Sequence, residues 1–224
     1  MDPKMLIRRY RDEAVACRLW LGPGHAPRRL RVATTLLSAE LAAAVLNEMG
    51  LPPEPASSYR HVNVHNPRHA LRHDRRRGGW VAVPGLEQHP VWGLNWDAAV
   101  LLCRQLGARL PTAAEWEGFA AGGEPGVAYP WGDAEPSPAR ANYDEHYAGT
   151  TPVGTFPPNA LGLYDLAGNL AEWCEDAPPG GPASERVAKG GAWSKGAGLL
   201  HIRASRSKWA RLGTTTIGLR PVWD

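Results

Sequence analysis

The sequence predicts an α+β fold, because its helical patterns lie in the first half and its short strand candidates in the second. Hydrophobic residues recur at helical spacing after Ser38, Asn95 and Thr112, and each of these residues can cap a helix. After Ala121 the chain becomes rich in turns, and the whole sequence holds 25 Gly and 21 Pro. Two or three helices followed by a loop-rich half with few strands are typical of α+β proteins.

The first 50 residues are expected to form two helices and one strand. Met5–Leu19 is predicted as a short helix, and the arginine-rich segment after it as a strand. Ser38 begins the next helix, and Gly50, followed by two prolines, ends it. Its apolar face consists of Leu41, Val45, Leu46 and Met49.

Two further helices are expected between residues 95 and 121. Asn95 begins the first and Gly107 ends it, whereas Thr112 begins the second and forms a capping box with Glu115. The inner faces consist of Trp96, Ala99, Val100 and Cys103 in the first helix and Trp116 and Phe119 in the second. Later in the chain, the segments that can form strands are Arg186–Lys189, Leu200–Ala204 and Ile217–Val222.

Histidines recur every four residues in the segment 61–73, at His61, His65, His69 and His73. On one continuous helix they would line one face and bind a transition metal, but Pro67 interrupts that helix. A basic loop is the favoured interpretation. Its arginines, Arg68, Arg72 and Arg75–Arg77, could contact nucleic acid phosphates, although such loops more often only solvate a surface.

Charge and cysteine content indicate a soluble, cytoplasmic protein. The formal net charge of +3 does not by itself predict a nucleic acid partner. The three cysteines, Cys17, Cys103 and Cys174, are odd in number and lack metal-binding spacing, which is typical of a reducing compartment. The N-terminal region has no apolar run of signal-peptide or membrane-spanning length, so we expect no membrane partner.

The stretch Leu161–Trp173 mixes apolar residues with polar ones in a way that indicates a cation site. Asp165, Asn169 and Glu172 supply carboxylate and amide oxygens, and backbone carbonyls lie between them. Hard cations prefer this mixture of oxygen ligands. The alternative is a tight turn whose polar side chains satisfy the local backbone.

Several later motifs, taken in order, resemble one family. They are HPVWGLNWDAAVLLCRQLGARLPTAAEWEGFA from His89 to Ala120, then YPWGD, ANYD, TPVGTFPPNALGLYDLAGNLAEW, GGAW and IGLR. This order is similar to that of the formylglycine-generating-enzyme, or sulfatase-modifying-factor, family. The resemblance implies a variant of the C-type lectin fold, loop-rich, with two to three helices and short antiparallel strands.

The family's oxidase chemistry requires two reactive cysteines that bind copper just after the GGSW-like turn. Here the corresponding segment, Ser194–Arg203, reads SKGAGLLHIR and contains no cysteine. We therefore expect no copper and no catalytic activity, because thiolates supply both the soft ligand and the nucleophile. The alternative is a metal-dependent oxidase or sulfoxide synthase of the same family with histidine ligands, for which the candidates are His61, His65 and His201.

The segment from Trp193 to Thr216 departs most from the family pattern, whereas the framework residues around it hold their usual places. This is similar to the variable proteins of diversity-generating retroelements, whose C-type lectin scaffold ends in a diversified ligand-binding region. The resemblance implies an N-terminal extension at 1–31 and a domain at 32–224 that binds an unidentified ligand, expected to be a protein, through residues 193–216. The residues expected on this surface are Trp193, Ser194, Lys195, Ala197, Leu199, His201, Ser205, Ser207, Lys208, Trp209, Leu212, Thr214 and Thr215.

The resemblance also implies structural calcium at two places. One is the GN-x-x-E element, with side-chain ligands Asn169 and Glu172 and carbonyl ligands Gly168 and Leu170. The other is the ANYD region, where the corresponding residues are Asn142, Tyr143, Glu145 and Tyr147. Such an ion would hold irregular backbone that lacks ladder hydrogen bonds.

Overall fold

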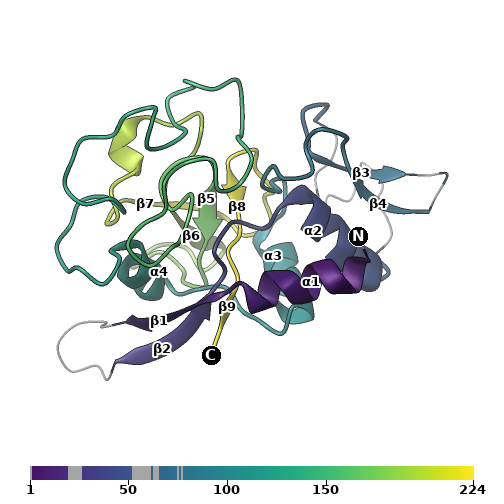
Figure 1. The fold of residues 1–224 in the computed structure, drawn as a ribbon, viewed down its shortest axis with the longest axis horizontal. Helices are drawn as coiled ribbons and strands as arrows, with labels where there is room; N and C mark the ends of the chain where they lie inside the picture. The colour runs from purple at the N-terminus through teal and green to yellow at the C-terminus, as the bar shows by residue number, and fades with distance from the viewer. Residues whose placement is uncertain (1, 20–26, 52–61, 63–65, 75, 77) are drawn as a thin grey trace.

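The computed structural model describes residues 2–19, 27–51, 62, 66–74, 76 and 78–224. Helices α1, α2 and α3 lie together, and the long loops of residues 121–170 spread over the opposite side (Figure 1). The fold class is α+β, as predicted, and the described part of the chain contains four α-helices rather than two or three. None of these helices has the length and apolar character needed to cross a bilayer.

The N-terminal segment forms a helix followed by a strand, so the prediction of one helix over Met5–Leu19 was wrong in its second half. Helix α1 (Pro3–Asp12) ends at Glu13, and β1 (Val15–Leu19) follows. Within β1, Cys17 and Leu19 are buried and alternate with exposed residues, which is the period of a strand. The predicted arginine-rich strand is confirmed as β2 (Arg28–Val32), which pairs antiparallel with β1.

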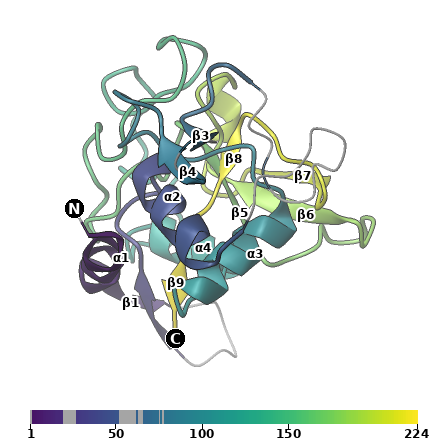
Figure 2. The same cartoon turned by 90° about the vertical axis from the view of Figure 1, so that its right-hand side faces the viewer.

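The three helices predicted from their caps are confirmed. Ser38 caps α2 (Ala39–Glu48) and Asn95 caps α3 (Trp96–Gln105), each by accepting a backbone N–H with its side chain. Thr112 and Glu115 form the predicted capping box of α4 (Ala113–Ala120). The hairpin of β3 (Leu71–Asp74) and β4 (Gly79–Ala82) packs beside α2 (Figure 2).

The C-terminal half contributes a four-stranded sheet with the order β7-β6-β5-β8. Its strands are β5 (Ala171–Trp173), β6 (Glu185–Lys189), β7 (Ser205–Trp209) and β8 (Ile217–Gly218). All pairs are antiparallel except β5 with β8, which is parallel. The predicted strand at Leu200–Ala204 was wrong, because Ala197–Leu199 form a 3-10 turn and pairing with β6 begins only at Ser205.

Two apolar clusters fill the interior on either side of this sheet. The first joins α1, α2 and α3 to the face that carries Ala188 and Trp173. The second joins α4 to the β1–β2 ribbon and to Val187. The last strand, β9 (Val222–Trp223), pairs with β2, so the predicted extension at 1–31 and the predicted domain at 32–224 share one three-stranded sheet.

Candidate ligand-binding surface

Near the end of the Leu161–Trp173 stretch, Glu172 forms a buried ion pair with Arg220. Glu172 lies on β5, and its carboxylate accepts from Arg220 Nη2 at 2.8 Å and from Trp116 Nε1 at 2.8 Å. Both charged residues have no solvent exposure. Arg220 Nε also donates to Glu172, Nη1 donates to the Ala33 carbonyl and Nη2 donates also to the Tyr164 carbonyl, so every guanidinium nitrogen has an acceptor. Satisfying every polar group is the condition under which a buried ion pair is tolerated.

The GN element docks on Asn142. Gly168 has φ of +82°, and a Cβ at this position would lie 2.3 Å from the Asn142 carbonyl oxygen, so only glycine fits. The next amide, that of Asn169, donates to the same carbonyl at 2.8 Å. The Asn169 side chain accepts from Thr151 N and donates to Thr151 O, both at 3.1 Å.

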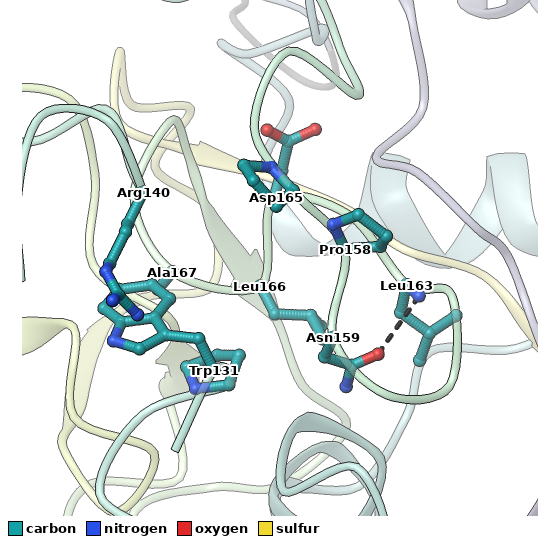
Figure 3. Close-up of a pocket in the computed structure, with 10 residues that line it drawn as sticks. Trp131, Arg140, Pro158, Asn159, Leu163, Asp165, Leu166 and Ala167 are labelled. Carbon is teal, nitrogen blue, oxygen red and sulfur yellow. Dashed lines mark hydrogen bonds between the residues drawn. The ribbon is translucent and has the colours of Figure 1, made fainter. Parts of the chain in front are cut away.

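Among the described residues, two buried oxygen atoms near this element have no hydrogen-bond partner, Asn142 Oδ1 and Asp165 Oδ1. Burial raises the pKa of Asp165 to about 6, and its other oxygen accepts from Gly154 N at 2.7 Å. Figure 3 shows its carboxylate pointing away from Asn159, which accepts from the Leu163 amide in the same loop. Unpartnered acceptor oxygens suit a hard cation, so Asn142 fits the predicted calcium chemistry and Asp165 adds a carboxylate.

Three of the other predicted calcium ligands, Glu172, Tyr143 and Tyr147, already form hydrogen bonds within the protein. Both Glu172 oxygens already accept hydrogen bonds, so this side chain points to Arg220 and Trp116 rather than to Asn169. The Tyr143 carbonyl accepts from His146 Nδ1, and the Tyr147 hydroxyl donates to the Pro138 carbonyl. Glu145 is exposed and Leu170 is buried. The calcium assignment stays a prediction.

The residues predicted to bind ligand share one property, which is that none of the thirteen is buried. The chain segments on either side of them, by contrast, are buried at Gly190 to Ala192 and at Thr216 to Arg220. Leu200 and Ile202 are also buried within the segment and anchor it to the body. Residues 193–216 therefore form a surface segment that is fixed at both ends and in its middle.

Nine of these thirteen residues can be assigned to three groups by their contacts or by their strand. Trp193 and Lys195 receive backbone hydrogen bonds from the loop at 144–145, and Trp193 Nε1 donates to the Thr215 carbonyl at 3.4 Å. Ala197 and His201 lie against Tyr129. Ser205, Ser207 and Trp209 project from one face of β7 and Lys208 from the other, because successive strand residues alternate. The large exposed apolar side chains of the segment are Trp209, 66% exposed, and Leu212, 49% exposed.

Trp193 and Thr215, from the first group, line a cleft of about 830 Å³. We call it the tryptophan cleft, and it is lined by Asn66, Arg68, Leu86, His89, Trp92, Trp193, Thr215 and residues 147–152. Trp193 packs beside Trp92, and the Tyr147 ring meets Phe156 edge-on. Sequence reasoning missed Trp92 and His89, although both lie in the quoted HPVW motif, because nothing local links residue 89 to residue 193.

His69 packs against Trp92, which lines this cleft. Its ring lies 4.2 Å from that of Trp92, centroid to centroid, and Nε2 lies 2.7 Å from the Trp92 carbonyl. Its Nδ1 accepts from Leu71 N at 2.9 Å, so the neutral tautomer has both nitrogens occupied. Burial lowers the pKa of His69 to about 4. Burial also lowers the pKa of His89, whose Nδ1 lies 3.0 Å from Thr150 Oγ1.

The favoured interpretation of a basic loop was wrong over Leu71–Asp74, which forms β3, and the two histidines of the segment 61–73 that the structure describes do not lie on a helix. His69 precedes β3 and is used as described, and His73 lies within β3 against Trp80. His61 and His65 lie outside the described residues, as do Arg75 and Arg77, whereas Arg72 is exposed on β3. Over the part of the chain that is described, no group of three or more His, Cys, Asp or Glu side chains could hold a metal ion.

The three cysteines are unpaired and buried. Burial raises the pKa of Cys17 to about 11, and it also raises the pKa values of the Cys103 and Cys174 thiols. A buried thiol that stays protonated is neither a nucleophile nor a metal ligand. None of these residues lies in the segment 194–203, where the resemblance places the reactive pair.

Residues 44–224 match the family described as the sulfatase-modifying factor enzyme 1-like domain. This chain belongs to that family. Treponema denticola variable protein 1 superimposes with a TM-score of 0.62, covering 94% of this chain and 92% of that chain at 20% identity. The predicted C-type lectin-like fold of the formylglycine-generating-enzyme subtype is thereby confirmed.

Two relatives match this chain over only part of their own length. Serine/threonine-protein kinase pkn1 of Chlamydia pneumoniae is 43% identical over 138 residues, which are 54% of this chain and 22% of the kinase. The formylglycine-generating enzyme of Thermomonospora curvata is 35% identical over 159 residues, covering 51% of this chain and 52% of the enzyme. The chain thus spans about half or less of these curated relatives.

Proposed function

We propose that this chain is a non-catalytic ligand-binding protein whose segment 193–216 is a diversified recognition surface, as in a diversity-generating retroelement variable protein. One observation carries this proposal: every predicted surface residue is at least partly exposed, whereas the framework at both ends is buried. Exposed side chains can be exchanged at little cost in stability, typically within about 0.5 kcal/mol. A structural likeness to a protein titled a variable protein supports the same reading of the fold.

The proposed ligand is a protein, and the tryptophan cleft receives one of its apolar side chains. Binding energy at protein interfaces concentrates in a few aromatic anchors that fill desolvated pockets. Trp92 and Trp193 supply such a pocket, and the hydroxyls of Thr150 and Thr215 supply polar contacts at its edge. Trp209 provides a second aromatic side chain, which is 66% exposed.

The absence of catalysis is supported by the chemistry of the cysteines. The family's oxidase reaction needs exposed thiolates after the GGAW turn, and this chain has Lys195 and Leu200 in the region instead. Its three thiols are buried and protonated, which also fits the reducing environment of the cytoplasm as the proposed location.

The proposed cofactor is structural Ca²⁺ bound beside Asn142. Asn142 and Asp165 each offer a buried side-chain oxygen without a partner, and the carbonyls of Gly168 and Leu170 are the further ligands that the resemblance implies. When bound, the ion would supply positive charge to buried oxygens that the fold leaves unpaired. Excess EGTA should then lower the melting temperature of the wild type but not of N142A/D165N, and equal effects on both would contradict the site.

A display library tests the recognition surface directly. One library randomises Ser194, Lys195, Ser205, Trp209, Leu212 and Thr215, and the control library randomises six buried framework positions, namely Leu166, Val187, Ala192, Leu200, Ile217 and Leu219. Because the first set is exposed and the second buried, we expect most members of the first library, and few of the second, to resist protease. Selection of the first library against unrelated proteins should yield specific binders. Equal protease sensitivity of the two libraries would refute the proposal.

A further inference from the structure

Positive charge is concentrated at the start of the chain. Residues 1–32 hold eight Lys and Arg against three Asp and Glu, a balance of +5, although the whole chain carries only +3. The remaining 192 residues therefore balance to −2. The excess belongs to α1 and the β1–β2 ribbon, which lie together at one edge of the molecule (Figure 1).

Acidic partners neutralise part of this charge. On α1, Arg8 pairs with Asp12 at 3.8 Å and Arg9 with Glu13 at 2.7 Å. At the start of β2, Arg28 binds the buried carboxylate of Glu115 at 2.6 Å. These arginines are accounted for by contacts within the fold.

The outer face of the ribbon is different. In β1 and β2, Cys17 and Leu30 point inward, so Arg18, Arg29 and Arg31 project from the opposite face into solvent. Arg18 and Arg29 are direct cross-strand partners. Neither side chain forms an ion pair or hydrogen bond with any residue that the structure describes, and the Arg31 guanidinium donates only to the carbonyl of Arg11. Like charges directly opposite each other destabilise a sheet.

These arginines line a hollow of about 440 Å³ on the same face. One carboxylate, that of Asp224, also borders it, but Arg109 binds both of its oxygens at 2.8 and 3.1 Å. The large exposed hydrophobic residues of the described chain are Met5, Tyr147, Trp209 and Leu212, and none of them lies on the ribbon. Ala16, Cys17 and Leu30 also line the hollow, but Cys17 and Leu30 are buried. The face is therefore cationic and carries no large exposed hydrophobic side chain.

We propose that the outer face of the β1–β2 ribbon binds the phosphodiester backbone of a nucleic acid without reading its sequence. A protein partner would need the aromatic or apolar core that interfaces usually contain, and this face has none. Nucleic acid interfaces are instead polar and strongly positive, with guanidinium groups bound to phosphate. The repulsion between Arg18 and Arg29 is removed when phosphate lies between them. This surface is separate from Arg68 and Arg72 and from residues 193–216, so it stands or falls independently of the proposed ligand surface.

The test measures binding of the intact chain to a fluorescent 20-base-pair DNA duplex and to a single-stranded RNA of mixed sequence, between 50 and 200 mM salt. Each phosphate contact contributes about 0.9 to the slope of log K against log salt for duplex DNA. We therefore expect R18Q/R29Q to reduce that slope by about 1.8 and to weaken binding at 50 mM salt at least tenfold. The control R8Q/R9Q removes the same charge from arginines that already have acidic partners, and it should change the slope little.

Folding does not confound this comparison, because both ribbon arginines are exposed and R18Q/R29Q relieves repulsion. Its melting temperature should equal or exceed that of the wild type. The proposal is overturned by three results: no salt-dependent binding of either nucleic acid at 50 mM salt, equal losses in the two double variants, or equally tight binding of polyglutamate, which would assign the face to acidic proteins. Binding of the duplex, the RNA or both, with the loss confined to R18Q/R29Q, supports it.

Discussion

Protonation of His69 should destabilise the fold and disturb the tryptophan cleft. The ordinary pKa of histidine is 6.5, and burial lowers that of His69 to about 4, only partly opposed by the hydrogen bond to the Trp92 carbonyl. Its ring is 2% exposed, and the Leu71 N–H occupies the side of Nδ1 where a second proton would bind. The imidazolium form therefore loses a hydrogen bond as well as hydration.

The sign of the effect follows from proton uptake. Between pH 6.5 and 4 the unfolded chain binds a proton at this residue and the native chain does not, so stability rises with pH in this window. The contribution is fully present above pH 6.5 and is lost as the pH falls towards 4. A difference of about 2.5 pKa units corresponds to about 3 kcal/mol of unfolding free energy at pH 4, at 1.36 kcal/mol per unit.

Urea denaturation at pH 7.5, 5.5 and 4.5 measures this contribution when the wild type is compared with H69Q. Glutamine loses the ring stacking at every pH but does not titrate, so the variant should start lower and then fall less steeply. The lowered pKa of His89 acts in the same direction in both proteins and cancels in the difference. The variant H201Q, altered at a partly exposed histidine, serves as the control and should follow the wild type. Parallel pH profiles for the wild type and H69Q would refute the reasoning.

Three further substitutions test the rest of the structure. R220M should lower the unfolding free energy by about 3–5 kcal/mol, because it leaves the Glu172 carboxylate buried and unpaired. The double variant E172M/R220M should recover part of that loss. A smaller loss for R220M than for the double variant would contradict the pairing. G168A should lower the unfolding free energy by at least about 2 kcal/mol, because its Cβ meets the Asn142 carbonyl. The control G162A, at φ +77° with nothing within 4 Å of the added Cβ, should lower it by about 1 kcal/mol. Equal melting temperatures would show that the close approach does not matter. W209A should change the unfolding free energy by no more than about 0.5 kcal/mol, since the side chain is 66% exposed. The same change in a selected binder that retains Trp209 should abolish binding.

The sequence predicted those elements whose cause is local. Ser38, Asn95 and Thr112 each accept the backbone N–H expected of a cap, because capping depends on residues only three positions apart. The N-terminal prediction failed since one window covered two periods, helical before Glu13 and alternating after it. Strand β7 was missed because SRSKW is a polar edge strand without a hydrophobic pattern.

The candidate site was predicted less completely, because its parts are distant in sequence. Residues 193–216 could be identified from motif positions, and their exposure followed. The tryptophan cleft joins Trp92 to Trp193, and the ion pair joins Glu172 to Arg220, and no local pattern reports either pairing. Asp165 stood out as a polar residue in an apolar stretch, but that one of its oxygens accepts from Gly154 and the other has no partner is visible only in the structure.

The positions of the anchors explain how this scaffold could tolerate exchange of its surface residues. Segment 193–216 begins after Gly190 and Gly191, where added Cβ atoms would meet the carbonyls of Leu166 and Leu199 at 2.8 and 3.0 Å. It ends before Arg220, whose guanidinium binds Glu172 and two backbone carbonyls. Strong constraints therefore lie just outside the exposed segment, and Leu200, Ile202 and Gly213 fix it from within. The exposed side chains between these anchors contribute little to stability. Related copies that have diversified should differ between these anchors and keep both glycines and the arginine, because a change there alters the fold before it alters recognition.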